Sequence, residues 1–163
     1  MNIQATAYHE AGHVVAHIVQ GLPVKSVTIV EGKDFYGAGA HPSPMMHSWS
    51  NGRELRQIAR SCIVSLFAGM EAERVFDPGV PDYGSSQDEA DAFEVSRDYH
   101  VFPRRMSCVG DDFHIDYLEQ LRKESRRLIK RHWNVVAAVA QKLLTEKTVD
   151  GETIAGIIDG RTI

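Results

Sequence analysis

The first twenty residues constrain the fold most, because they combine a helical repeat with a fixed spacing of histidines. Apolar side chains return at three- and four-residue intervals, at Ala7, Ala11, Val14, Val15 and Ile18. This repeat predicts an amphipathic helix from about Gln4 to Gln20, which Gly21 and Pro23 end. On such a helix His9 and His13 lie one turn apart on the same face.

The two histidines belong to the run His9-Glu10-Ala11-Gly12-His13. Histidines four residues apart on a helix can both bind Zn²⁺, and the intervening Glu10 then lies beside the metal-bound water. A polar helix face with surface histidines is the alternative interpretation. His17 repeats the spacing, but three histidines in line do not all reach one metal, so we expect a structural or supporting role for it.

A catalytic zinc ion takes three protein ligands and keeps one position for water. The extended motif with a third histidine is absent, since Ala16 and Val19 occupy the places of its Gly and His. Glu71 and Glu73 on a later helix, and Asp88, remain as candidates. Asp88 is favoured because it falls in the first turn of a predicted helix, where the helix dipole stabilises an ionised carboxylate. An ordinary N-terminal helix charge is the alternative role for it.

The composition excludes several classes of protein. A length of 163 residues fits one domain, covering 1–163, and 43% hydrophobic with 25% charged residues is typical of a globular protein. The net charge of −4 argues against a nucleic-acid partner. Two cysteines are too few for a disulfide framework. No apolar run reaches the ~20 residues of a membrane span and no secretory signal is recognisable, so we expect a cytoplasmic protein without a membrane partner.

The rest of the chain predicts a mainly helical α+β fold. Further helices are expected over residues 53–76, 86–99, 115–144 and 151–158, the third of them bent. Extended segments at 24–30 and 35–40 predict a small β-sheet or hairpin beside the first helix. Within 53–76 one apolar stripe is expected to pack against the first helix; it consists of Leu55, Ile58, Ala59, Cys62, Ile63, Leu66 and Phe67.

Four ordered segments together resemble a known family. They are Thr6-Ala7-Tyr8-His9-Glu10-Ala11-Gly12-His13-Val14, Ala68-Gly69-Met70-Glu71-Ala72-Glu73-Arg74-Val75-Phe76, Gly84-Ser85-Ser86-Gln87-Asp88, and Leu143-Leu144-Thr145-Glu146-Lys147-Thr148-Val149-Asp150-Gly151. In this order they resemble the peptidase domain of the FtsH-type ATP-dependent zinc metalloproteases. The resemblance extends over most of the chain, and the joint match is far more specific than the histidine motif alone.

The resemblance implies a zinc-metallopeptidase domain and assigns a role to each residue. His9, His13 and Asp88 become the ligands of Zn²⁺. Glu10 becomes the catalytic general base, and Glu73 a nearby acidic residue that orients the first helix. A metallopeptidase of another clan, with Glu71 or Glu73 as third ligand, is a rival interpretation.

The same resemblance places a substrate-binding strand at Phe35 to Ala40. Polypeptide substrate is expected to add as a further strand along Tyr36, Gly37, Ala38 and Gly39. Departures from the family pattern are Ala68 for Gly, Met70 for Arg and Gln87 for Asn. They leave the ligands intact, so they affect substrate choice and assembly more than chemistry.

The chain lacks the Gly-x-x-x-x-Gly-Lys-Ser/Thr phosphate loop of an ATPase. We therefore expect a zinc-dependent endopeptidase that hydrolyses unfolded or flexible polypeptides without ATP when it acts as an isolated chain. A separate unfoldase or ATPase partner is left open, as is an oligomer. The alternative function is a catalytically silent module that keeps the metallopeptidase fold to bind a partner protein.

Overall fold

The computed structural model describes residues 2–30, 52–79, 86–99, 101 and 111–160, and in these ranges it is mainly helical. The elements are α1 (Ile3–Val19), β1 (Ser26–Thr28), α2 (Gly52–Phe76), α3 (Ser86–Asp98), α4 (Asp111–Arg131), α5 (Trp133–Glu146), β2 (Thr148–Asp150) and α6 (Gly151–Ile158). The predicted mainly α-helical α+β class is thereby confirmed. Among the described ranges, no helix has the length and apolar character needed to cross a membrane.

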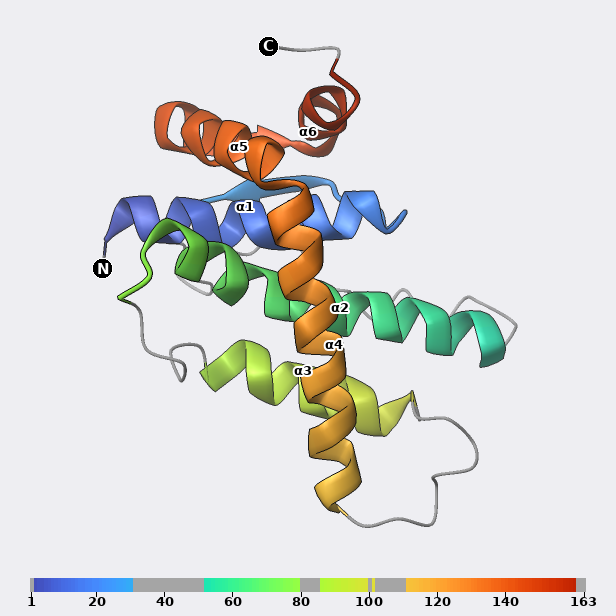
Figure 1. The fold of residues 1–163 in the computed structure, drawn as a ribbon. Helices are drawn as coiled ribbons and strands as arrows, with labels where there is room; N and C mark the ends of the chain where they lie inside the picture. Colours follow the sequence, from blue (N-terminus) through green and yellow to red (C-terminus); the bar gives the residue numbers. More distant parts are fainter. Residues whose placement is uncertain (1, 31–51, 80–85, 100, 102–110, 161–163) are drawn as a thin grey trace.

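Helix α1 lies at the centre of the arrangement (Figure 1). It packs between α5 on one side and α2 on the other, while α3 packs on α2 away from α1. Helix α4 crosses α2 and α3 and leads into α5. Residues from the middle and the last thirds of the chain therefore enclose the helix that carries the histidine motif.

The helix boundaries follow local sequence signals closely. The Asn2 side chain accepts a hydrogen bond from the backbone N–H of Gln4 at 3.0 Å and caps α1. The long helix expected at 115–144 is two helices, α4 and α5, which meet at His132. In place of the expected bend, one helix ends and a second begins.

The sheet is small and joins distant parts of the chain. Strands β1 and β2 pair antiparallel, with Val27 opposite Val149. A short strand therefore lies beside α1, as expected, but its partner comes from the C-terminal region. The extended segment predicted at 35–40 lies outside the described residues.

Two hydrophobic cores lie on different sides of α2. One joins α1, α5, α6 and the sheet, and α2 adds Ala68 and Ala72 to it. The other joins α2 to α3 and α4, and contains Ile63 and Phe67. The prediction that the large apolar stripe of 53–76 packs on the first helix is thus wrong. The first helix packs instead on the small side chains of α2, where a Cβ at Gly12 would lie 2.4 Å from the carbonyl oxygen of Ala68.

Candidate metal centre

Helix α1 brings the two motif histidines together, with the edge of one ring toward the face of the other. Their Nε2 atoms lie 2.9 Å apart, and the ring planes meet at 81°. His13 is buried and His9 is partly buried. The one-turn spacing in the sequence thus places two nitrogen atoms at one point on the inner face of α1.

Asp88, in the first turn of α3, completes a group of three. Its Oδ2 atom lies 3.2 Å from Nε2 of His9 and 3.4 Å from Nε2 of His13. The ligand atoms of these three residues all lie within 4.8 Å of one another, close enough to hold one metal ion. Among the histidine, cysteine and acidic residues of the described ranges, this is the group that meets that condition. The structure therefore brings together the residues that were predicted as ligands.

Helix α2 supplies a hydrogen-bond partner for the Nδ1 atom of each histidine ring. Nδ1 of His9 lies 3.3 Å from Oε2 of Glu73, and Nδ1 of His13 donates to the carbonyl oxygen of Ser65 at 2.8 Å. In a neutral ring, a proton on Nδ1 leaves the lone pair of Nε2 available to a metal. Partners of this kind fix the tautomer and orientation of histidines that bind metals. Glu73 was predicted near the first helix, and the structure shows which atom it contacts.

Ser65 was missed by sequence reasoning because its contribution is a backbone oxygen, which every residue has. One signal was available. Ser65, Gly69 and Glu73 follow one another at four-residue intervals and therefore share the face of α2 that meets α1. At Gly69 a Cβ would lie 2.4 Å from Nε2 of His13, so the ring occupies the space that any larger residue would need.

Glu10 lies on α1 between the two histidines and is buried. Burial raises the pKa of its carboxyl to about 7, against the opposing charges of His13 and His9. For Asp88, burial is outweighed by hydrogen bonds from His13 and His9, which hold the pKa of its carboxyl well below the usual range. For His9, burial is outweighed by Asp88 and Glu73, which raise the pKa of the imidazole to about 10. The cluster thus favours positive charge at its centre.

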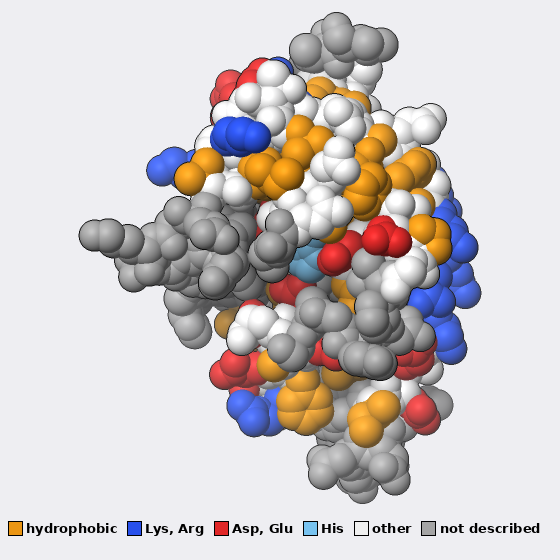
Figure 2. All heavy atoms as spheres, turned by 90° about the vertical axis from the view of Figure 1, so that its left-hand side faces the viewer, with side chains coloured by type: hydrophobic (Ala, Val, Ile, Leu, Met, Phe, Trp, Pro, Cys, Tyr) orange, Lys and Arg blue, Asp and Glu red, His pale blue; other side chains and the backbone are white. Residues whose placement is uncertain are grey.

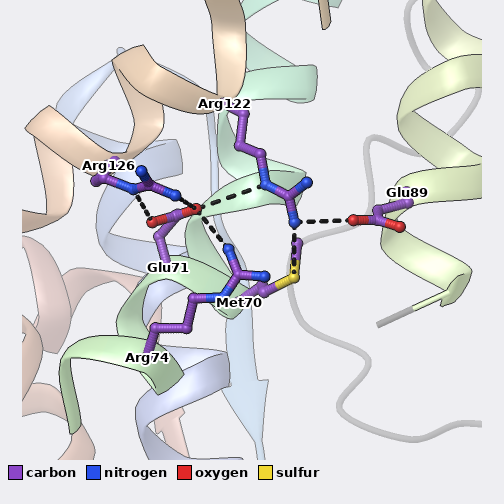
Figure 3. A network of polar contacts seen from close by, with 6 residues as sticks. All are labelled: Met70, Glu71, Arg74, Glu89, Arg122 and Arg126. Carbon is purple, nitrogen blue, oxygen red and sulfur yellow. Dashed lines mark hydrogen bonds and ion pairs between the residues drawn. The ribbon is translucent and has the colours of Figure 1, made fainter. Parts of the chain in front are cut away.

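The other predicted residues lie elsewhere. Glu71 points to the arginines of α2 and α4, and not to the histidines (Figure 3). His17 is buried on α1, apart from the group of three. The substrate-binding residues predicted at 36–39 lie outside the described residues. The face of the molecule that turns to the viewer in Figure 2 exposes a histidine surface beside acidic side chains, below a patch of hydrophobic ones.

Sequence comparison finds a known protein that is similar to this chain at low identity. The chain is 28% identical over 178 aligned positions to ATP-dependent zinc metalloprotease FtsH 1 of Alkaliphilus metalliredigens. The alignment includes 95% of this chain but 29% of that protein, so the chain spans less than a third of its relative. No protein-family model matches the chain.

The donor set fits a zinc ion. Two imidazole nitrogens and one carboxylate oxygen are ordinary zinc ligands, and three of them leave a fourth position open. Bonds of ~2.0–2.2 Å in a tetrahedral site place ligand atoms roughly 3.3 Å apart. The three distances among Nε2 of His9, Nε2 of His13 and Oδ2 of Asp88 are 2.9, 3.2 and 3.4 Å. Small adjustments of these side chains would therefore admit the ion.

Proposed function

We propose that this chain is a zinc-dependent endopeptidase that hydrolyses unfolded or flexible polypeptides. The observation that carries the proposal is the convergence of His9, His13 and Asp88 with a buried carboxyl, Glu10, between the two histidines. Similarity to a protein described as a zinc metalloprotease supports the same chemistry. In this proposal the three converging residues hold Zn²⁺.

Each residue has a definite task in the reaction. When bound there, Zn²⁺ supplies Lewis-acid chemistry, polarising the scissile carbonyl and acidifying water. Glu10 takes a proton from the attacking water and later gives it to the leaving amine. Burial raises the pKa of this carboxyl in the metal-free site, which favours proton uptake from the attacking water. Glu73 and the Ser65 carbonyl keep the two imidazoles oriented.

The substrate class follows from what the chain contains. The relative is described as ATP-dependent, whereas the sequence of this chain has no phosphate loop. We therefore propose that the chain alone cleaves polypeptides that are already extended, and that folded substrates need a separate unfoldase or ATPase. A cytoplasmic location fits this proposal.

The test uses purified chain loaded with Zn²⁺, an unstructured substrate such as casein, and Glu10→Gln. This substitution keeps the size of the side chain and removes the base. We expect unchanged zinc content and thermal stability, with turnover lower by ~10²–10⁴. Glu94→Gln, which alters an exposed carboxylate of α3, is the matched control and should cleave like the parent.

Three outcomes would contradict the proposal in different ways. Unchanged cleavage by Glu10→Gln would remove that residue from the mechanism. Cleavage that ATP accelerates with the purified chain alone would overturn the ATP-independent part. A parent protein that binds zinc but cleaves none of several flexible polypeptides would favour a catalytically silent module that binds a partner protein.

A further inference from the structure

Arg122 of α4 connects α4 with α2 and α3 (Figure 3). Its Nη2 atom donates to Oε1 of Glu89 in α3 at 2.8 Å and lies 3.1 Å from the sulfur of Met70 in α2. Its Nε atom lies 3.6 Å from Oε1 of Glu71. The guanidinium also lies over the ring of Phe67, 5.7 Å from its centroid. This side chain therefore spans from α2 to the beginning of α3.

Glu89 is the neighbour of Asp88 in the first turn of α3. Successive residues of a helix point about 100° apart. Asp88 accordingly reaches the histidines of α1 while Glu89 reaches Arg122. Two contacts in different directions fix both the position of this turn and its rotation about the helix axis. Any force on Glu89 is thus transmitted to Asp88 through one peptide unit.

The other end of the connection is firmly held. Glu71 is almost fully buried, and its carboxylate also binds Arg126 at 2.7 Å and Arg74 at 3.0 Å. Buried carboxylates with several charged partners keep one orientation, because each lost partner leaves a buried charge uncompensated. Helix α2 also holds both histidines, through Glu73 and Ser65. Arg122 therefore links the turn that carries Asp88 to α2, the same helix that orients His9 and His13.

We propose that Arg122 is a positioning residue that holds the first turn of α3, and with it Asp88, at the distance from His9 and His13 that metal binding requires. The inference rests on the proposed function, because it concerns a ligand of the proposed zinc ion. A planar guanidinium can contact Glu71 and Glu89 together, whereas a lysine ammonium is a single point of charge. Loss of Arg122 leaves α3 packed on α2 by its apolar residues but lets its first turn move.

Zinc affinity of the full chain is the first measurement, by competition with a chromophoric chelator. We expect Arg122→Met to bind Zn²⁺ about 10-fold more weakly, the lower end of the effect of outer-sphere partners. Arg122→Lys should restore part of the loss. The control is Arg60→Met, because Arg60 also ties α2 to α4, through Glu124, without reaching α3. Its zinc affinity should equal that of the parent even where its stability falls.

Co²⁺ in place of Zn²⁺ provides a spectroscopic signature that a loss of stability alone does not change. We expect Arg122→Met to alter the visible bands of bound Co²⁺, since a displaced Asp88 changes the ligand geometry, and Arg60→Met to leave them unchanged. Glu89→Gln should reproduce the effect of Arg122→Met. Combining the two should add little, because both weaken the contact between Arg122 and Glu89.

A measurement without metal separates this inference from the proposed function. In the metal-free protein, amide hydrogen exchange in the first turns of α3 should be faster in Arg122→Met than in the parent or in Arg60→Met. If the parent binds no zinc, the proposed function fails while this measurement still tests the connection. Equal zinc affinities in Arg122→Met and Arg60→Met, or unchanged α3 exchange, would overturn the positioning role. If Arg122→Met does not fold, Glu89→Gln decides the question by the same measurements.

Discussion

Two polar clusters lie on opposite faces of α2 and differ in what their carboxylates contact. Glu73 faces α1, where it contacts His9 beside Asp88; we refer to His9, His13, Asp88 and Glu73 as the histidine cluster. Glu71 faces α4, where it contacts Arg122 and Arg126, and it also contacts Arg74 of α2; these four residues are the arginine cluster. The two glutamates are two residues apart, and two steps of a helix turn the side chain through about 200°.

The difference shows why acidic residues near cations are poor evidence of a metal site. In the arginine cluster the carboxylate is neutralised by guanidinium groups, which stay protonated in proteins and have no lone pair for a metal. In the histidine cluster the partners are imidazoles, which can lose a proton and present a nitrogen to a metal. Helix α2 thus carries a cluster of paired charges on one face and supports a cluster suited to a cation on the other.

Removal of zinc should give the largest effect. A ligand that binds only the folded state at 1,000 times its Kd adds about 4 kcal/mol of stability. We expect chelation to lower the unfolding temperature of the parent accordingly, and His13→Ala to abolish the difference between the zinc-loaded and the chelated sample. His17→Ala is the control on the same helix, one turn further on. Its zinc-dependent difference should persist, and its disappearance would place His17 among the ligands.

Two glycines test how closely α1 and α2 must approach at the histidine cluster. A Cβ at Gly69 would lie 2.4 Å from Nε2 of His13, so we expect Gly69→Ala to displace that ring and weaken zinc binding by about 100-fold, the upper end for a supporting residue. A Cβ at Gly12 would instead meet the backbone of Ala68. Gly12→Ala should therefore lower the free energy of unfolding by ~1–3 kcal/mol through overpacking.

Zinc titration and chemical denaturation of both glycine variants make this distinction. Equal zinc affinities in Gly69→Ala and the parent would show that the His13 ring has room to move. A Gly12→Ala protein as stable as the parent would show that the two helices separate at little cost. Either result would mean that the histidine cluster does not depend on so close an approach of α1 to α2.

The sequence predicted those features of the site that depend on residues close together in the chain. Histidines one turn apart must share a helix face, and a carboxylate in the first turn of a helix was expected at Asp88 on local grounds. It could not reveal the Ser65 carbonyl or the Arg122 contacts, because those depend on which helix packs where. The large apolar stripe of 53–76 was assigned to the wrong partner for the same reason, since its spacing fits any apolar surface. The strand at 148–150 needed a partner more than a hundred residues away.

The smallest effects should come from single supporting contacts on the two faces of α2. Arg126→Met removes two hydrogen bonds to Glu71 while Arg74 and Arg122 remain in contact with it. Because Arg126 is partly exposed, we expect a loss of only ~1–2 kcal/mol in the free energy of unfolding, near the low end for charged hydrogen bonds. Zinc affinity should not change, since Arg122 keeps its contact with Glu89.

Glu73→Gln is the matching change on the other face. Its amide keeps the shape of the side chain but loses the charge that holds the Nδ1 proton of His9. We expect weaker zinc binding, by ~10-fold, with little change in the stability of the metal-free protein. Zinc titration and denaturation of both variants therefore distinguish the two faces of α2. Arg126→Met should lower the free energy of unfolding but not the zinc affinity, and Glu73→Gln should lower the zinc affinity but not the stability of the metal-free protein. A loss of zinc affinity in Arg126→Met as large as that in Glu73→Gln would mean that the two clusters act as one unit through α2.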